Sequence, residues 1–255
     1  MTIFNLKGKS ILITGSSRGI GKSIARQCAL HGANVIISSR KLNVCEAAAD
    51  EINSEVGSEV AFPIAANISD ENQLKELVSS TREKLGKIDT LICNAATNPF
   101  MGSMLDMPNE KFDKVMNNNI KSNQILCNLV LPEMIERNDG SIIIISSIAA
   151  IKGSPILGAY NISKAADVMI VKNIATEFGH KNIRANSIAP GLIKTDFAKA
   201  LWENPDILES VLSTTPMKRI GEPDEISGVA VMLASDAGNY INGQTIVVDG
   251  GTTIS

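Results

Sequence analysis

The sequence has very few of the residues that build metal sites and disulfide frameworks. Among 255 residues there are two histidines and four cysteines (Cys28, Cys45, Cys93 and Cys127), and no two cysteines form a C-x-x-C pair. A structural zinc site needs four such ligands close together, and disulfides persist in oxidising compartments. We therefore expect no metal site and four reduced thiols in a cytoplasmic protein.

A long apolar run and an excess of one charge are also lacking. No stretch approaches the roughly 18 apolar residues that a membrane-spanning helix needs, and 24 basic residues are balanced by 27 acidic ones without a block of like charge. A nucleic-acid-binding surface is usually strongly basic, and an anionic membrane attracts basic clusters. The sequence thus predicts a soluble protein that binds a small molecule, with no nucleic-acid or membrane partner.

What the sequence does contain is a regular alternation of two kinds of segment. Segments with helical periodicity separate seven short, apolar, β-branched runs, which lie at residues 10–14, 34–38, 59–65, 88–93, 141–146, 183–189 and 244–249. Buried strands that alternate with helices are typical of a parallel sheet covered on both faces. We predict a single doubly wound α/β domain over residues 1–255, with a seven-stranded parallel sheet and a helical lid insertion at about 192–215.

A glycine-rich turn, TGSSRGIG, follows the first predicted strand and opens the first helical segment. Gly15, Gly19 and Gly21 allow a sharp turn and a close approach to a pyrophosphate, while the helix N-terminus supplies free N–H groups. The G-K-[ST] ending of a kinase-type P-loop is missing, which disfavours ATP hydrolysis. The turn predicts a Rossmann-type dinucleotide site, and a glycine turn without a ligand is the alternative.

The end of the second predicted strand lacks an acidic residue. In NAD sites an Asp or Glu at this place accepts a hydrogen bond from the ribose 2′-hydroxyl. Here the sequence reads SSRK, and the nearest acid is Glu46. Because guanidinium forks suit phosphate oxygens, we expect Arg40 and Arg18 to clamp the 2′-phosphate of NADP. The alternative is that both arginines are ordinary solvated side chains.

Tyr160 and Lys164 lie four residues apart in the segment GAYNISKAA. On a helix this spacing places them on one face, about 6 Å apart. The ordinary interpretation is a half-buried phenol with a lysine that reaches to water. The chemical interpretation is that an ammonium close to a phenol stabilises the phenolate, which lowers the pKa of the phenol towards the range useful for proton transfer.

Six motifs, in order along the chain, resemble those of the short-chain dehydrogenase/reductase superfamily. They are TGSSRGIG, NAAT, NNNI, ISS, YNISK and APGLIKT. Through SSRK, NPFMGS, SSIAA and APGLIKTDF, the chain is most similar to NADP-dependent carbonyl and retinal reductases related to the peroxisomal short-chain alcohol dehydrogenases. Two positions depart from the common pattern: Asn67 replaces an Asp, and NAA replaces NAG. The C-terminal TIS also departs from the peroxisomal tripeptide, so that location is not carried over.

This resemblance implies roles for individual residues. Tyr160 would be the acid/base and Lys164 its electrostatic partner and ribose anchor, while Ser147 would hold the substrate oxygen and Asn119 would relay protons. Ser147 is preferred to its neighbour because it lies thirteen residues before Tyr160, and Asn119 because it precedes Ile-Lys. The implied cofactor-binding residues are Gly15, Ser17, Arg18, Gly19, Ile20, Gly21, Ser39, Arg40, Lys41, Asn67, Ile68, Asn94, Ala95, Tyr160, Lys164, Pro190, Gly191, Ile193 and Thr195.

The reaction implied by the resemblance is hydride transfer between NADP(H) and a carbonyl or secondary alcohol with an apolar body. A 3-oxoacyl-thioester reductase is an alternative, because that group shares nearly every motif. A redox sensor that binds NADP without turnover is an alternative of another class, although such proteins usually lack the tyrosine or the lysine.

Two predicted helices, over residues 159–178 and roughly 109–136, are apolar on almost every side. A helix in a single domain can pack one face on the sheet, so its outer face needs a further cover. Two such helices from each subunit could form a four-helix interface about a two-fold axis. We therefore expect a homo-oligomer, and the resemblance implies a homotetramer.

Overall fold

The computed structural model describes residues 2–255 and contains one seven-stranded sheet in which every neighbouring pair is parallel. The strand order is β3-β2-β1-β4-β5-β6-β7. The strands are β1 (Ser10–Thr14), β2 (Asn34–Ser38), β3 (Ala61–Pro63), β4 (Thr90–Cys93), β5 (Gly140–Ile145), β6 (Ile183–Pro190) and β7 (Thr245–Val248). The predicted fold class is confirmed. The edge strand β3 is shorter than the apolar run at 59–65 that predicted it.

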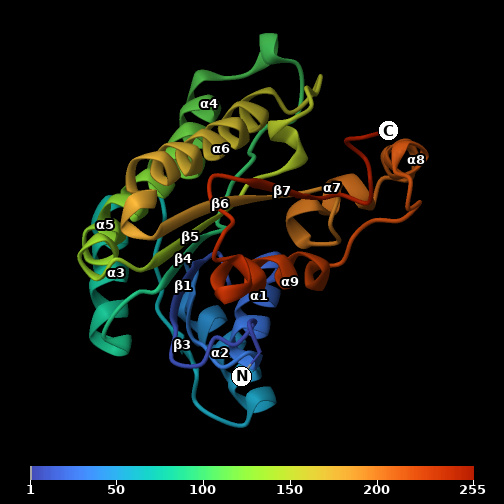
Figure 1. Ribbon diagram of the computed structural model, residues 1–255. Helices are drawn as coiled ribbons and strands as arrows, with labels where there is room; N and C mark the ends of the chain where they lie inside the picture. The colour runs from blue at the N-terminus through green and yellow to red at the C-terminus, as the bar shows by residue number, and fades with distance from the viewer. Residues whose placement is uncertain (1) are drawn as a thin grey trace.

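Helices cover both faces of this sheet (Figure 1). One face carries α1 (Gly19–Leu30), α2 (Leu42–Val56) and α9 (Pro223–Ala234), and the other carries α3 (Glu71–Leu85), α5 (Ser122–Arg137) and α6 (Gly158–Phe178). The shorter helices are α4 (Asn109–Val115), α7 (Lys199–Trp202) and α8 (Pro205–Thr214). None of the helices within residues 2–255 is long and apolar enough to cross a bilayer.

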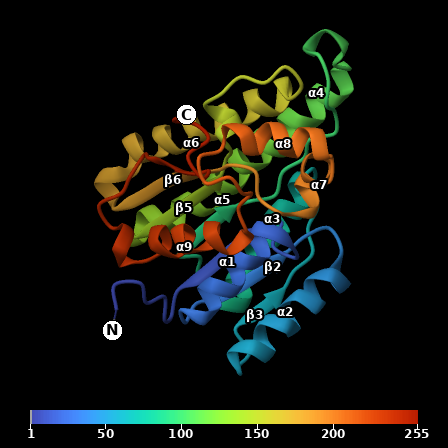
Figure 2. The same cartoon turned by 90° about the vertical axis from the view of Figure 1, so that its right-hand side faces the viewer.

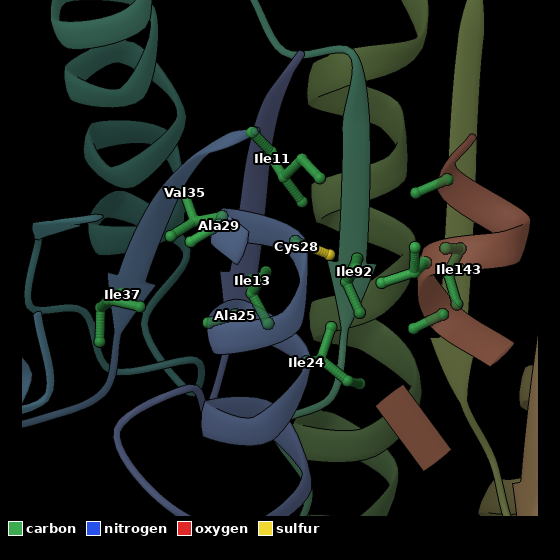
Figure 3. Packing of buried hydrophobic residues seen from close by; sticks show 14 of the residues in the cluster. Ile11, Ile13, Ile24, Ala25, Cys28, Ala29, Val35, Ile37, Ile92 and Ile143 are labelled. Atoms are coloured by element: carbon green, nitrogen blue, oxygen red, sulfur yellow. The ribbon is translucent and has the colours of Figure 1, made fainter. Parts of the chain in front are cut away.

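The core is divided by the sheet into two layers because successive side chains of a strand point to opposite faces. Ile11 and Ile13 of β1 contribute to the layer under α1, whereas Leu12 contributes to the layer under α3 and α5. Figure 3 shows α1 lying over the central strands, with Ile24 and Cys28 directed towards them. Full burial of each large aliphatic side chain is worth about 1.5–3 kcal/mol. This packing fixes the start of α1 at the carboxyl end of β1.

The first and last long helices of the chain also pack on each other. In α1, Ser23 donates from Oγ to Asp224 of α9 over 2.5 Å, and Arg26 Nη1 lies 3.7 Å from the same carboxylate. Figure 2 shows the two helices side by side. The covering of one sheet face is thus completed only by the C-terminal part of the chain.

The helix predicted over roughly 109–136 is present and runs without a break from Asn109 to Arg137. It contains a π-helical turn, η2 (Met116–Lys121), between α4 and α5, which the sequence did not predict. A π turn contains one residue more than an α turn and is common at functional sites. It brings Asn118 and Asn119 into the interior.

The segment predicted to be a lid consists of a 3₁₀ turn, η5 (Asp196–Ala198), followed by α7 and α8. Trp202 is anchored by a hydrogen bond from Nε1 to the carbonyl of Thr195, 2.9 Å long. The C-terminus lies beside α8 (Figure 1), where Ser255 donates from Oγ to the carbonyl of Thr214. The segment is helical as expected, and its function as a lid stays a prediction.

Candidate active site

In the turn between β1 and α1, Gly15 and Gly21 lie too close to neighbouring atoms for a side chain to fit. Gly15 has φ +66°, and a Cβ at this position would lie 2.9 Å from the Cα of Ala95. At Gly21 a Cβ would collide with the carbonyl oxygen of Gly15 and with the amide of Asn94. Asn94 follows β4, the strand beside β1 in the sheet, and stabilises the turn. Its Nδ2 donates to the carbonyls of Thr14 and Gly15, both at 3.0 Å. The result is a rigid backbone cradle at the edge of the sheet.

The start of α1 fits an anion. Its N-cap residue, Arg18, makes no capping hydrogen bond with its side chain, and the first turn of the helix contains no acid. The first N–H groups of a helix need partners and carry positive potential. The residues that line a surface groove beside them include Gly19, Lys22, Lys194 and Thr195. The two carboxylates of this groove, Asp196 and Asp224, are paired with Arg18 and Arg26. Cradle, helix terminus and groove together fit the pyrophosphate of a dinucleotide.

At the end of β2 the structure presents Ser39, Arg40 and Lys41 next to this cradle. Arg40 and Lys41 are exposed, and within residues 2–255 neither forms an ion pair. Arg18 differs, because its Nη1 lies 3.1 Å from the Asp196 carboxylate at the start of η5. Two arginines are expected to bind a 2′-phosphate. Of these, Arg40 is the one whose guanidinium forms no ion pair with the described residues, so it is available to a ligand.

The other expected cofactor-binding residues also lie at or just after the carboxyl ends of strands. Asn67 and Ile68 follow β3, and Asn94 and Ala95 follow β4. Pro190 is the last residue of β6, and Gly191, Ile193 and Thr195 follow it. At Gly191 a Cβ would lie 2.8 Å from the Cα of Asp249, so the chain passes closely here. The structure therefore brings the expected residues to one edge of the sheet.

Tyr160 and Lys164 lie on the first turns of α6, and Nζ of the lysine is 5.8 Å from the centre of the phenol ring. The ring of Phe197, from η5, lies beside that of Tyr160, with the two ring centres 6.1 Å apart and the ring planes tilted by 40°. Ser147 follows β5 and caps a short 3₁₀ turn, η3 (Ile148–Ala150), where its Oγ accepts from the N–H of Ala149 at 3.1 Å. Its hydroxyl proton has no partner among residues 2–255, so it is free to donate to a ligand.

Asn119 is completely buried in the π turn, and its side chain is fully used. Oδ1 accepts from the N–H of Thr97 at 2.8 Å, and Nδ2 donates to the carbonyl of Thr97 and to the Ser163 hydroxyl, each at 3.0 Å. Ser163 in turn donates to the carbonyl of Tyr160. Asn119 thus ties the loop after β4 to the start of α6, and its backbone carbonyl accepts from Asn123 Nδ2 at 2.7 Å.

Sequence reasoning missed one residue of this region, Asp167. Its carboxylate is completely buried, and its Oδ2 accepts from Lys164 Nζ at 2.9 Å. A second N–H of Lys164 donates to the carbonyl of Ile145 at 2.8 Å. One signal was present, since Asp167 is the only acid between Lys164 and Glu177 in a helix that otherwise looks apolar.

The predictions about cysteines and metals can be compared with the structure. All four cysteines are free and buried, and burial raises the pKa of Cys28 to about 12. In the part of the chain that the structure describes, no cluster of three His, Cys, Asp or Glu side chains could hold a metal ion. The side chains brought together in the candidate site are a tyrosine, a lysine, a buried carboxylate, hydroxyls and amides.

A dinucleotide cradle beside a paired tyrosine and lysine is the arrangement of a nicotinamide-dependent dehydrogenase or reductase. Comparison with known families agrees with this class: the family model described as Enoyl-(Acyl carrier protein) reductase matches residues 15–253. The chain belongs to the short-chain dehydrogenase/reductase family, as its motifs predicted.

Individual relatives span nearly the whole chain. Dehydrogenase/reductase SDR family member 4 of Bos taurus is 42% identical over 247 residues, which cover 97% of this chain and 88% of the relative. A 7α-hydroxysteroid dehydrogenase, solved with NADH and 7-oxo glycochenodeoxycholic acid, is 38% identical with a TM-score of 0.92 over 97% of this chain and 95% of that one. A gluconate 5-dehydrogenase from Burkholderia cenocepacia, solved with NADP and tartrate, is 30% identical with a TM-score of 0.94 over 99% and 98% of the two chains.

Proposed function

We propose that the protein is an NADP(H)-dependent reductase of ketones or aldehydes with apolar bodies. The observation that carries the proposal is a combination of two features. Arg40, after β2, is exposed and without an ion pair among the described residues, and Tyr160 and Lys164 lie together on α6. The solved relatives bind either NADH or NADP. The choice of NADP therefore rests on this chain's own SSRK segment, which offers cations where an NAD site has a carboxylate.

The cofactor-binding residues divide by the part of the dinucleotide that they would hold. The glycine cradle and the start of α1 would bind the pyrophosphate, Ser39, Arg40 and Lys41 the 2′-phosphate, and Asn67 the adenine. Lys164 would bind the nicotinamide ribose, and Ile193 and Thr195 the carboxamide. When bound, the nicotinamide supplies the hydride, which is the difficult part of the chemistry.

The protein's own contribution is to deliver a proton and to hold the substrate oxygen. Tyr160 donates the proton as the carbonyl oxygen gains negative charge, and Ser147 donates a hydrogen bond to the same oxygen. The Lys164 ammonium stabilises the phenolate that remains. Phe197, whose ring is half exposed beside Tyr160, supplies an apolar wall for the substrate body.

The experiment is a substrate panel with NADPH, followed by loss of nicotinamide absorbance, with Tyr160→Phe as the matched variant. General acid catalysis contributes about 10²–10⁴-fold, so we expect Tyr160→Phe to lose at least 100-fold in kcat. NADPH binding, measured by fluorescence titration, stays within about twofold because the ring still packs. Reductase activity that survives in Tyr160→Phe would overturn the mechanism.

The same panel separates the alternative functions. An acetoacetyl thioester belongs in it, because 3-oxoacyl-thioester reductases share nearly every motif of this chain. A preference for this thioester over simple ketones and aldehydes would favour that substrate class. Tight NADPH binding without turnover of any carbonyl would favour a redox sensor. We also propose a cytoplasmic location, for which the free thiols are the supporting observation.

A further inference from the structure

Lys164 lies in a closed polar network that the proposed reaction does not by itself require. Two of its three N–H groups are used within the chain, one by the carbonyl of Ile145 and one by Asp167. An ammonium has three donors and no acceptor. A single N–H is therefore left for a ligand, and its direction is set by the other two.

Asp167 is itself held from a second side. Its Oδ1 accepts from Asn123 Nδ2 at 2.9 Å, and the same Nδ2 group donates to the backbone carbonyl of Asn119 at 2.7 Å. Asp167 and Asn119 are fully buried, and Asn123 is 2% exposed. A continuous hydrogen-bonded path thus runs from the π turn through α5 to the lysine on α6, without solvent.

A buried carboxylate is costly unless it is paired, so its presence needs a reason. Burial alone disfavours the charged form of Lys164, but the Asp167 carboxylate, together with Tyr160 and Cys93, outweighs it and raises the pKa of the lysine above its ordinary value of 10.5. Burial in turn raises the pKa of Asp167, against the opposing effect of Lys164 and Asn123. Each group makes the charge of the other tolerable in the interior.

The other groups that face the lysine do not replace Asp167. Tyr160 lies on the same helix, and β5 contributes only the Ile145 carbonyl. From β4, the thiol of Cys93 faces the pair; its hydrogen bond with Cys127 of α5, together with burial, raises its pKa well above the ordinary value and keeps it neutral. Among the groups of residues 2–255 that face Nζ, Asp167 is therefore the only carboxylate.

Resting on the proposed function, we propose that Asp167 is a positioning residue of the reaction. It keeps Lys164 charged and aims its remaining N–H at the ligand. Through Asn123 it also couples the lysine to the π turn. Asp167 acts through the lysine and does not itself contact the substrate.

The test compares pH profiles of kcat/KM for alcohol oxidation with NADP⁺ in wild type and Asp167→Asn. In alcohol oxidation, kcat/KM rises with pH as Tyr160 loses its proton and becomes the base. It falls again at higher pH when Lys164 loses its proton, so the plot of kcat/KM against pH is bell-shaped. Removing a negative charge favours proton loss from every neighbouring group. We expect both limbs to move to lower pH, the alkaline limb by at least one unit. Asp167→Glu, which keeps the carboxylate, should return both limbs towards the wild-type positions.

The matched control is Asp89→Asn, which removes the buried carboxylate at the opposite edge of the sheet. Asp89 accepts from the Ser10 N–H at 2.8 Å, pairs with Lys87 at 2.8 Å and is 2% exposed. This variant should lose thermal stability and keep the wild-type bell. If Asp167→Asn only lowers the height of the bell, as a merely structural residue would, the proposal is wrong.

A second measurement needs neither turnover nor a stable Asp167 variant. The ¹⁵Nζ signal of Lys164 in the wild-type chain, identified as the one lost in Lys164→Arg, should titrate at higher pH than the signals of exposed lysines. If the Lys164 signal titrates at the same pH as those of the exposed lysines, or at a lower pH, the proposal is wrong. If no alcohol is turned over, the proposed function fails, while this titration still decides whether Lys164 is held in its charged form.

Discussion

At the scale of single residues, we expect Arg40 to decide the preference for NADP over NAD. A hydrogen bond to a charged group is worth about 1.5–3 kcal/mol, which corresponds to roughly 10- to 100-fold in binding. We expect Arg40→Ala to raise the KM for NADPH at least tenfold and to leave the KM for NADH within about twofold, because NADH has no 2′-phosphate.

Steady-state kinetics with both cofactors measure this, and NADH is the internal control. The companion substitution Arg18→Ala should have the smaller effect, because in the structure Arg18 is paired with Asp196. Wild-type protein that used NADH with an equal or better kcat/KM would contradict the assignment.

The sequence reaches some site residues and misses others for a physical reason. Tyr160 and Lys164 could be paired from their spacing alone, since a helix brings residues four apart together. Asp167, three residues after Lys164, has the spacing of an ordinary surface ion pair. Only tertiary packing, with Asn123 from another helix on its other side, turns it into a buried network.

At the scale of elements, the start of α9 is stabilised by a single carboxylate with two partners. Glu225 accepts from the N–H of Glu222 at 2.8 Å and from both terminal nitrogens of Arg219, at 2.6 and 2.7 Å. The hydrogen bonds from Arg219, followed by that from the backbone, lower the pKa of Glu225 from 4.5 to about 2. The lowered pKa means that the stabilisation is complete above pH 4.5 and is lost as the pH falls towards 2.

We therefore expect Glu225→Gln to lower the Tm by about 1–3 °C at pH 7, in line with the loss of an exposed helix cap. The difference from wild type should shrink between pH 4.5 and 2, since the wild-type carboxylate is then protonated too. Thermal unfolding followed by circular dichroism measures it, with Glu209→Gln on exposed α8 as the control. A Tm difference that stays constant down to pH 2 would contradict the cap.

Elements differ in how well the sequence predicts them. The central strands were predicted within one or two residues because a strand buried on both faces must be a continuous apolar run. The π turn was not predicted, since its one-residue excess leaves no mark on the apolar pattern of residues 109–136. Its position depends instead on the Thr97 backbone, to which Asn119 is tied.

At the scale of the whole molecule, the apolar outer side of α6 favours an oligomer. Ile162 is 43% and Met169 is 53% exposed in the single chain. The outer side of α5 is more polar than the sequence suggested, because Gln124 and Asn128 are exposed there and hydrogen-bond to each other. Of these two helices, α6 is therefore the one with large apolar side chains exposed on its outer side.

We expect a homotetramer, with a light-scattering mass near four times 27.1 kDa. Met169→Glu should shift the mass to a smaller species, because a charge in the centre of an apolar interface is costly. Leu42→Glu, at a similarly exposed apolar position (48%) on α2 over the other face of the sheet, is the control for the charge change alone. Fully active protein with a monodisperse mass of 27.1 kDa would contradict the prediction.

The packing of α1 on α9 has a consequence for how the protein is made. Ser23 and Asp224 are 201 residues apart in the chain, and a ribosome adds about 5–20 residues per second. During translation, α1 therefore waits roughly 10–40 seconds for its last neighbour. Until then the nascent chain exposes the surface of α1 that α9 later buries, which makes the unfinished polypeptide a natural client for chaperones.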